Sequence, residues 1–82
     1  MGLEVVEFVQ AVEEEFGIKI KETDAEHLIT PRKVADYVAF CLGETPRDDI
    51  LRRVIQIASE QFDVPLEQIL PDHDFVKDLG VG

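Results

Sequence analysis

The sequence predicts an all-α fold, a four-helix bundle with three longer helices, one short helix and a long loop. Three observations support this. Apolar residues recur every three or four positions in three long segments, which is the period of an amphipathic helix. Strand-like alternation occurs only around Ile18 and Ile20. Hydrophobic residues make up 45% of the 82 residues, which suffices for the core of one small domain.

The first long segment, Leu3 to Phe16, has two different faces when its residues are spaced by about 100°, as in an α-helix. One face is an apolar stripe that fits a core: Val5, Phe8, Val9, Val12 and Phe16. Leu3 and Val6 fall on the opposite face among polar residues, namely Glu7, Gln10, Glu13 and Glu14. We interpret this outer face as a docking surface. The alternative is that the two apolar side chains are simply exposed, as single ones commonly are.

Capping residues predict the next two helices. Gly17 suits a helix end, and the loop after it is expected to turn Ile18 and Ile20 inward. Thr23 with Glu26 matches a capping box, which predicts a short helix over residues 24–29. Thr30-Pro31 provides an N-cap and a first-turn proline for a helix that reaches about residue 42. Its expected inner face contains Val34, Val38 and Cys41, with Tyr37 and Leu42 at the edges.

The second half of the chain follows a short polar linker, residues 43–46. Thr45-Pro46 is expected to start a long helix that ends near residue 62. This helix has a broad apolar face and should be the most buried element: Ile50, Leu51, Val54, Ile55, Ile57, Ala58 and Phe62. Beyond it, Pro65 and Pro71 predict a long loop that carries a helical turn, folds back on the bundle and points Phe75 and Leu79 inward.

Composition excludes several functions. A net charge of −10 disfavours binding to nucleic acid and favours partners rich in Lys and Arg. No apolar run approaches the ~20 residues of a membrane span, and no signal peptide opens the chain, so we expect no membrane association. The single cysteine, Cys41, fits a reducing, cytoplasmic location. No catalytic constellation is present.

A dedicated metal site is also not expected. Asp72, Asp74 and Asp78 partly match a calcium-binding loop, but Lys77 stands where that loop needs glycine, and no glutamate follows at its twelfth position.

Two segments resemble the acyl carrier protein family. Residues 3–42, LEVVEFVQAVEEEFGIKIKETDAEHLITPRKVADYVAFCL, are similar to the second half of such a protein, from its recognition helix to its last helix. Residues 50–80, ILRRVIQIASEQFDVPLEQILPDHDFVKDLG, are similar to the first half, including the FxxDLG segment that starts at Phe75. Because the order is reversed, the resemblance implies one circularly permuted domain: second half 1–42, linker 43–46, first half 47–82.

In the family, a serine after FxxDLG and an aspartate carries the phosphopantetheine arm that holds the acyl group. Gly2 stands at the serine position and Gly82 at the aspartate position, and the only serine, Ser59, lies in the middle of a predicted helix. The resemblance therefore implies an unmodifiable, non-enzymatic scaffold without cofactor, which we interpret as an engineered permutant. Its parent function is to shuttle acyl thioesters in fatty acid or related biosynthesis.

The resemblance also assigns sites. Residues expected to dock on basic patches of acyl-chain synthases and transferases are Leu3, Glu4, Val6, Glu7, Glu13 and Glu14, with Asp24 and Glu26 on the short helix. Residues expected to line an acyl cleft are Val5, Val12, Ile50, Val54, Phe62 and Ile69. Two alternatives stay open: an acidic helical interaction module that never carried an arm, and an acidic metal-binding protein. The chain is expected to be a monomer or a dimer with exchanged halves.

Overall fold

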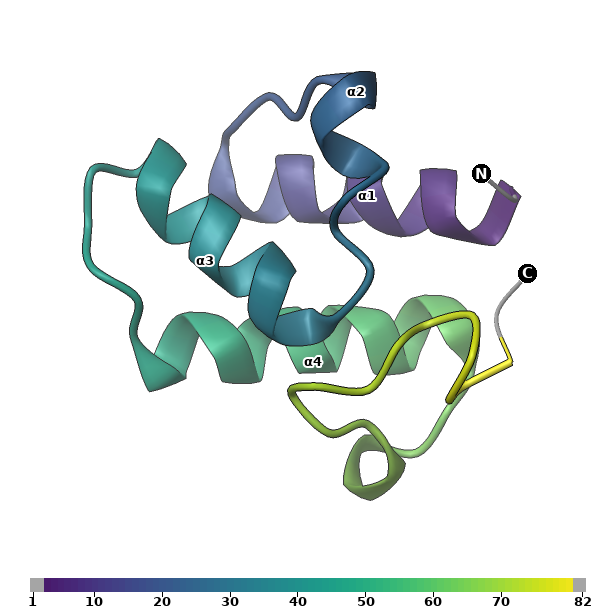
Figure 1. Ribbon diagram of the computed structural model, residues 1–82. Coiled ribbons are helices and arrows are strands. Elements are labelled where there is room, and N and C mark those ends of the chain that lie inside the picture. Colours follow the sequence, from purple (N-terminus) through teal and green to yellow (C-terminus); the bar gives the residue numbers. More distant parts are fainter. Residues whose placement is uncertain (1–2, 81–82) are drawn as a thin grey trace.

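The computed structural model describes residues 3–80, and its regular structure is entirely helical within that range (Figure 1). The elements, in chain order, are α1 (Leu3–Phe16), α2 (Glu22–Ala25), α3 (Pro31–Cys41), α4 (Asp48–Phe62) and a 3-10 turn, η1 (Leu66–Gln68). The all-α prediction is confirmed for these residues.

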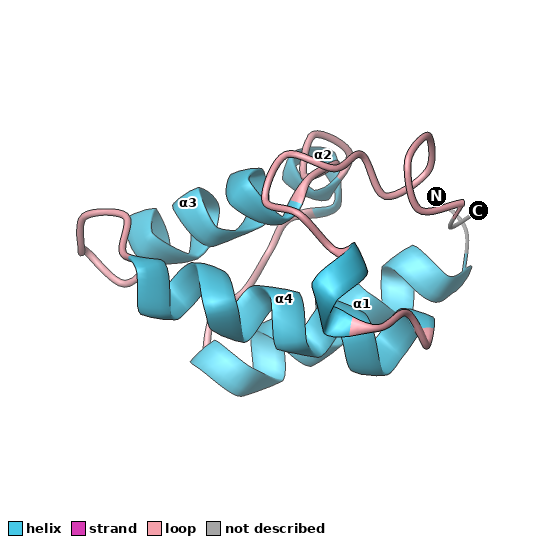
Figure 2. Cartoon of the chain, turned by 90° about the horizontal axis from the view of Figure 1, so that it is seen from below, coloured by secondary structure: helices cyan, strands magenta, loops and turns pink. Residues whose placement is uncertain are grey.

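Helix α4 is the hub of the bundle, because it packs against both α1 and α3 and also contacts η1. A second view, turned by 90°, shows α1 and α3 on different sides of α4 (Figure 2). Four residues of α4 at helical spacing are buried: Ile50, Val54, Ile57 and Ala58. Burial of each large aliphatic side chain contributes about 1.5–3 kcal/mol, so this stripe is a main source of stability.

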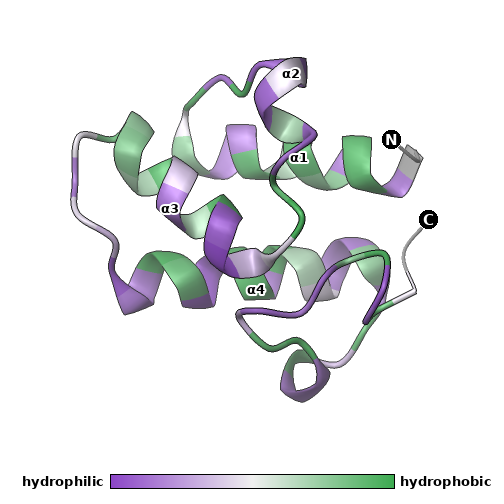
Figure 3. Ribbon diagram, viewed as in Figure 1, coloured by the Kyte–Doolittle hydropathy of each residue, from purple (hydrophilic) through white to green (hydrophobic). Residues whose placement is uncertain are grey.

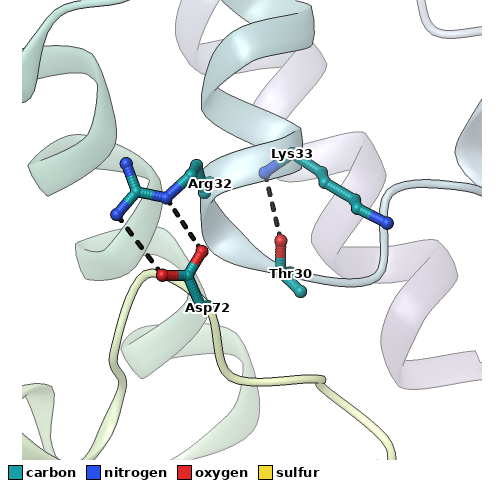
Figure 4. Close-up of polar contacts among 4 residues, drawn as sticks. All are labelled: Thr30, Arg32, Lys33 and Asp72. Carbon is teal, nitrogen blue, oxygen red and sulfur yellow. Dashed lines mark hydrogen bonds and ion pairs between the residues drawn. The ribbon is translucent and has the colours of Figure 1, made fainter.

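Helix α3 begins as predicted. The hydroxyl of Thr30 accepts a hydrogen bond from the backbone N–H of Lys33 at 3.1 Å, and Pro31 occupies the first turn (Figure 4). The placement of Cys41 on the inner face was wrong, because Cys41 is exposed. The buried face of α3 includes two alanines, Ala35 and Ala39, whose small side chains suit the close packing of α3 on α4. The other buried residues of this helix are Pro31, Val34 and Val38.

The short helix α2 lies earlier than predicted, at residues 22–25 instead of 24–29. Its N-cap is Lys21, which has extended backbone angles and provides no side-chain cap, so the expected capping box of Thr23 and Glu26 does not start the helix. After Ala25 the backbone turns, with the N–H of Leu28 donating to the carbonyl of Ala25, and this turn buries Leu28 in the core. The predicted inward turn of Ile18 and Ile20 is confirmed, since both pack against the core.

Helix α4 begins at Asp48, later than the predicted start at Thr45-Pro46. Arg47 is still extended, and its guanidinium pairs with Glu44 at 2.8 Å and with Asp49 at 3.1 Å. These contacts connect the linker to the first turn of the helix. Thr45 and Pro46, which were expected to start α4, therefore belong to the turn that joins α3 to α4.

The segment after α4 folds back on the bundle, as predicted, and inserts Phe75 into the core. Phe75 packs with Phe8 and Phe62, with ring centroids 5.2 and 5.5 Å away. Backbone hydrogen bonds join this segment to the start of α3, from Arg32 N–H to Pro71 and from Phe75 N–H to Ile29, both at 2.9 Å. An exposed ion pair between Arg32 and Asp72, at 2.8 Å, lies at the same junction (Figure 4).

The start of α1 and the end of the described chain lie at the same end of the bundle in both views (Figures 1 and 2). The predicted junction residues Gly2 and Gly82 fall outside the described residues. All three long helices carry hydrophobic residues (Figure 3), and many of these residues are buried in one core cluster. Within residues 3–80, no helix has the length and apolar character to cross a membrane.

Candidate partner-docking face

Helix α1 turns a row of carboxylates toward solvent. Glu4, Glu7 and Glu14 are exposed. The angular pattern placed Glu7 and Glu14 on the outer face of the helix, and the family resemblance added Glu4. Over residues 3–80, no ion pair involves any of the three. We name Glu4, Glu7 and Glu14 the acidic row. Leu3 begins α1, but its side chain lies outside the described part of the structure.

Glu13, which the sequence placed on the same face, is occupied by an internal contact. Its carboxylate accepts a hydrogen bond from the backbone N–H of Ile20 at 2.7 Å, and its carbonyl accepts one from Ile18 N–H at 3.1 Å. Glu13 therefore holds the loop between α1 and α2 against α1. Only one oxygen of the Glu13 carboxylate accepts the hydrogen bond from Ile20. Glu13 therefore positions the loop and also places a second acid next to Glu14 of the acidic row.

Asp24 also has an internal partner. Its carboxylate accepts a hydrogen bond from the hydroxyl of Tyr37 at 2.8 Å, which ties α2 to α3. This hydrogen bond, together with burial and the negative charge of Asp24, raises the pKa of Tyr37 to about 12. Glu26 is exposed, and its place on a docking face stays a prediction.

A shallow groove of about 310 Å³ lies between α1 and α2. Val6 lines it and is only half-exposed, because the loop and α2 lie beside it. The other lining residues are Val9, Gln10, Glu13, Ile20, Glu22 and Ala25. The sequence did not reveal the groove, since Ile20, Glu22 and Ala25 reach it only through the path of the loop. Val9 was predicted to be a core residue, and it both packs against the core and lines the groove. Its position at the edge of the apolar stripe was the one feature of the sequence that could have indicated the groove.

The ion pairs of the described residues involve acids outside the acidic row. Arg53 of α4 pairs with Glu15 at 2.6 Å, and this hydrogen bond lowers the pKa of Glu15. The remaining ion pairs of the described residues involve Arg32 and Arg47, which lie at the start of α3 and just before α4. Within residues 3–80 no ion pair neutralises the acidic row, so this row can attract a basic partner.

The six residues assigned to an acyl cleft all belong to the packed core. Val12, Ile50, Val54 and Ile69 are buried, and Val5 and Phe62 pack against them with partial exposure. The cleft assignment stays a prediction, because it concerns a state in which an acyl chain is present.

The carboxylates that partly match a calcium loop have partners within the protein instead. Asp74 accepts hydrogen bonds from the N–H groups of Val76 and Lys77, both at 2.9 Å, which lowers its pKa. Asp78 accepts one from the N–H of Asp74 at 2.7 Å, and Asp72 pairs with Arg32. Within residues 3–80, no group of three or more potential ligands is arranged to hold a metal ion.

Comparison with known proteins supports the family resemblance. The chain is 53% identical over 37 residues to "Acyl carrier protein 2" of Pseudomonas aeruginosa. It is 50% identical over 37 residues to the acyl carrier proteins of Buchnera aphidicola and Campylobacter hominis. Over these 37 residues the chain is similar to acyl carrier proteins.

Each match to an acyl carrier protein covers 45% of this chain and 47% of the relative, so the chain spans about half the length of the curated relatives it matches. No protein-family model matches the chain, and no solved structure matches it. The all-helical bundle of residues 3–80 agrees with the acyl-carrier-like fold class.

Proposed function

We propose that this chain is an acyl-carrier-type docking body whose two halves are transposed, and that it presents the acidic row of α1 to basic partners without itself bearing an arm. The observation that carries the proposal is the acidic row on α1, the helix that also forms one wall of the groove with α2. Within residues 3–80 no ion pair neutralises the row, and Val6 and Ile20 supply apolar lining to the groove. Charge of this kind steers a basic partner, while the apolar surface gives contact after encounter.

Two findings favour the transposed order. A linear alignment can pair only one of two exchanged halves, and the matched length of 37 residues is close to that of either half. In addition, the first described residues of α1 and the last described residues of the chain lie at the same end of the bundle (Figure 1). Residues 1–42 and 47–82 then rebuild one domain across the linker.

The carrier role of this chain depends on its attachment point. In the acyl carrier family the cofactor is phosphopantetheine, which supplies the thiol that bears the acyl group. The one serine of the chain, Ser59, lies in α4, and its hydroxyl donates a hydrogen bond to the carbonyl of Val64 at 2.6 Å. A hydroxyl held in this way at a helix end is a poor acceptor for the arm, so we expect no modification of the 82-residue chain.

The docking part of the proposal is tested by charge reversal. The variant Glu7→Lys/Glu14→Lys should weaken binding to a purified carrier-protein phosphopantetheinyl transferase at least tenfold in low salt, because two steering charges change sign. The matched control is Glu60→Lys/Glu67→Lys, which makes the same charge change at exposed positions outside α1, in α4 and η1. Equal weakening by both variants would mean that net charge, not this face, determines binding.

The transposition is tested by joining residue 82 directly to residue 2 in a variant that carries Gly82→Asp and Gly2→Ser. Treatment with the transferase and coenzyme A should add the mass of one arm, as measured by mass spectrometry. The control has the same join with Gly82→Asp and Gly2→Ala and should remain unmodified. A folded but unmodified serine variant would instead favour the second candidate function, an acidic helical interaction module that never carried an arm.

A further inference from the structure

We propose that a second copy of this chain is a specific partner, and that the two copies form a dimer by exchanging residues 48–80 about the linker. The proposal does not depend on the acyl carrier function. In the exchanged dimer, α4 of each copy would pack on α1 and α3 of the other.

The packing of the bundle makes such an exchange possible. The strongest helix contacts join the two halves: α4 packs on α1 and α3, whereas α1 and α3 make no comparable contact with each other. The aromatic cluster also crosses the linker, because Phe8 belongs to the first half and Phe62 and Phe75 to the second. Each half therefore completes its core only with the other half, and a half from another copy offers the same surfaces.

The linker has the features of a hinge. Residues 42–47 connect α3 to α4 at one edge of the molecule and are all exposed (Figure 1). Gly43 adopts a positive φ of 71°, with open space where a side chain would be. The turn is held by backbone hydrogen bonds from Gly43 N–H to the carbonyl of Phe40 at 3.1 Å and from Glu44 N–H to the carbonyl of Ala39 at 2.9 Å. It is also held by the exposed ion pairs of Arg47 with Glu44 and Asp49, and exposed pairs of this kind are weak. Opening the hinge therefore exchanges these contacts for contacts with water and breaks none in the hydrophobic core.

Exposed apolar side chains mark the place where the second copy would approach. Phe40, just before the linker, is 81% exposed, and Leu42 is 40% exposed. Figure 3 shows the end of α3 as hydrophobic up to the start of the linker. In an exchanged dimer the two linkers run beside each other, so these side chains gain a matching apolar surface. Burial of a pair of such side chains favours the dimer over two separate monomers.

The first test uses a contact that joins the halves. Glu15 of α1 and Arg53 of α4 lie 2.6 Å apart, so Glu15→Cys and Arg53→Cys in a Cys41→Ser background place two thiols within reach of a short thiol crosslinker. The protein is refolded from urea at millimolar concentration, and the dimer is isolated by gel filtration. Exchange predicts crosslinks between chains and a covalent dimer on a denaturing gel. Crosslinks only within chains would indicate surface association and would overturn the proposal.

The second test uses two glycines that share the same backbone conformation. Gly43→Ala strains the hinge turn of the monomer, and the strain is released when the hinge extends, so the dimer-to-monomer ratio should rise roughly tenfold. Gly17→Ala is the matched control, since Gly17 also has a positive φ and open surroundings but lies outside the linker. Its strain affects monomer and dimer equally and should leave the ratio unchanged. Failure of Gly43→Ala to form any dimer at millimolar concentration would refute the exchange.

Discussion

Phe75 is the residue whose loss should damage the fold most. Its side chain is 2% exposed and packs against the rings of Phe8 and Phe62. Phe75→Ala leaves a cavity between α1, α4 and the returning segment, and we expect it to lower the free energy of unfolding by about 3–5 kcal/mol. Urea unfolding monitored by circular dichroism measures this loss.

Phe40→Ala is the matched control, because it removes the same side chain from a site that is 81% exposed. Its effect on the free energy of unfolding should stay within about 0.5 kcal/mol. Similar losses in the two variants would show that the returning segment does not pack in the core as the structure has it.

Tyr37 gives a prediction on pH. Its hydrogen bond to Asp24 favours the protonated phenol, so the folded protein holds this proton up to a pKa of about 12, whereas the unfolded chain releases it near the ordinary value of 10. Between these two values the folded state binds more protons, so stability falls as the pH rises through this window. Absorbance titration of tyrosinate measures the pKa directly. Asp24→Asn should bring it down toward 10, and an unchanged value would exclude this carboxylate as the cause.

At the scale of elements, the end of α4 carries an avoidable strain. Asp63 caps this helix with left-handed angles, φ 55° and ψ 44°, and places a negative charge at the negative end of the helix dipole. Asp63→Gly removes both penalties and should raise the free energy of unfolding by about 0.5–1 kcal/mol. Thermal unfolding would show the gain as a higher Tm.

Gln61→Gly serves as the comparison for Asp63→Gly. Gln61 lies within the last turn of α4 and is exposed, so glycine there should lower the free energy of unfolding by up to about 1 kcal/mol. A loss of stability in both variants would mean that the left-handed cap is not strained.

The two Thr-Pro pairs show why helix starts were predicted with unequal success. Thr30-Pro31 starts α3 as expected, and the returning segment anchors this turn through the hydrogen bond from Arg32 N–H to Pro71. Thr45-Pro46 has equivalent local chemistry, yet it lies in the linker, where the chain must reverse before α4 begins. Local capping rules predict a helix start at both pairs. Contacts between residues distant in sequence determine which pair actually starts a helix.

At the scale of the whole molecule, the fold class and the acidic row were predictable, because helical period and charge are properties of the sequence itself. The groove was not, since its lining joins Val6 of α1 to Ile20 and Ala25 through the path of a loop. The internal partners of Glu13 and Asp24 were hidden for the same reason. A helical wheel shows which side chains lie on each face of one helix. It does not show which residues of other elements pack against that face.

The net charge of −10 leads to a final prediction in which salt has opposite effects on folding and docking. Raising the NaCl concentration from ~0.01 M to ~0.1 M shortens the screening length from ~30 Å to ~10 Å. Screening weakens the repulsion among the acids of the compact state, so the free energy of unfolding should rise. It also weakens attraction to a basic partner, so the dissociation constant of the complex with the transferase should rise.

Glu7→Gln/Glu14→Gln separates this mechanism from a general salt effect. Removing two charges from the acidic row, where no ion pair involves them within residues 3–80, should raise stability at ~0.01 M salt and leave a smaller gain on adding salt. The same variant should bind the transferase more weakly and with a shallower salt dependence. A loss of stability of the parent chain on adding salt would mean that the four ion pairs found within residues 3–80 stabilise the fold more than the repulsion among its acids destabilises it. The acidic row would then have no measurable effect on the free energy of unfolding.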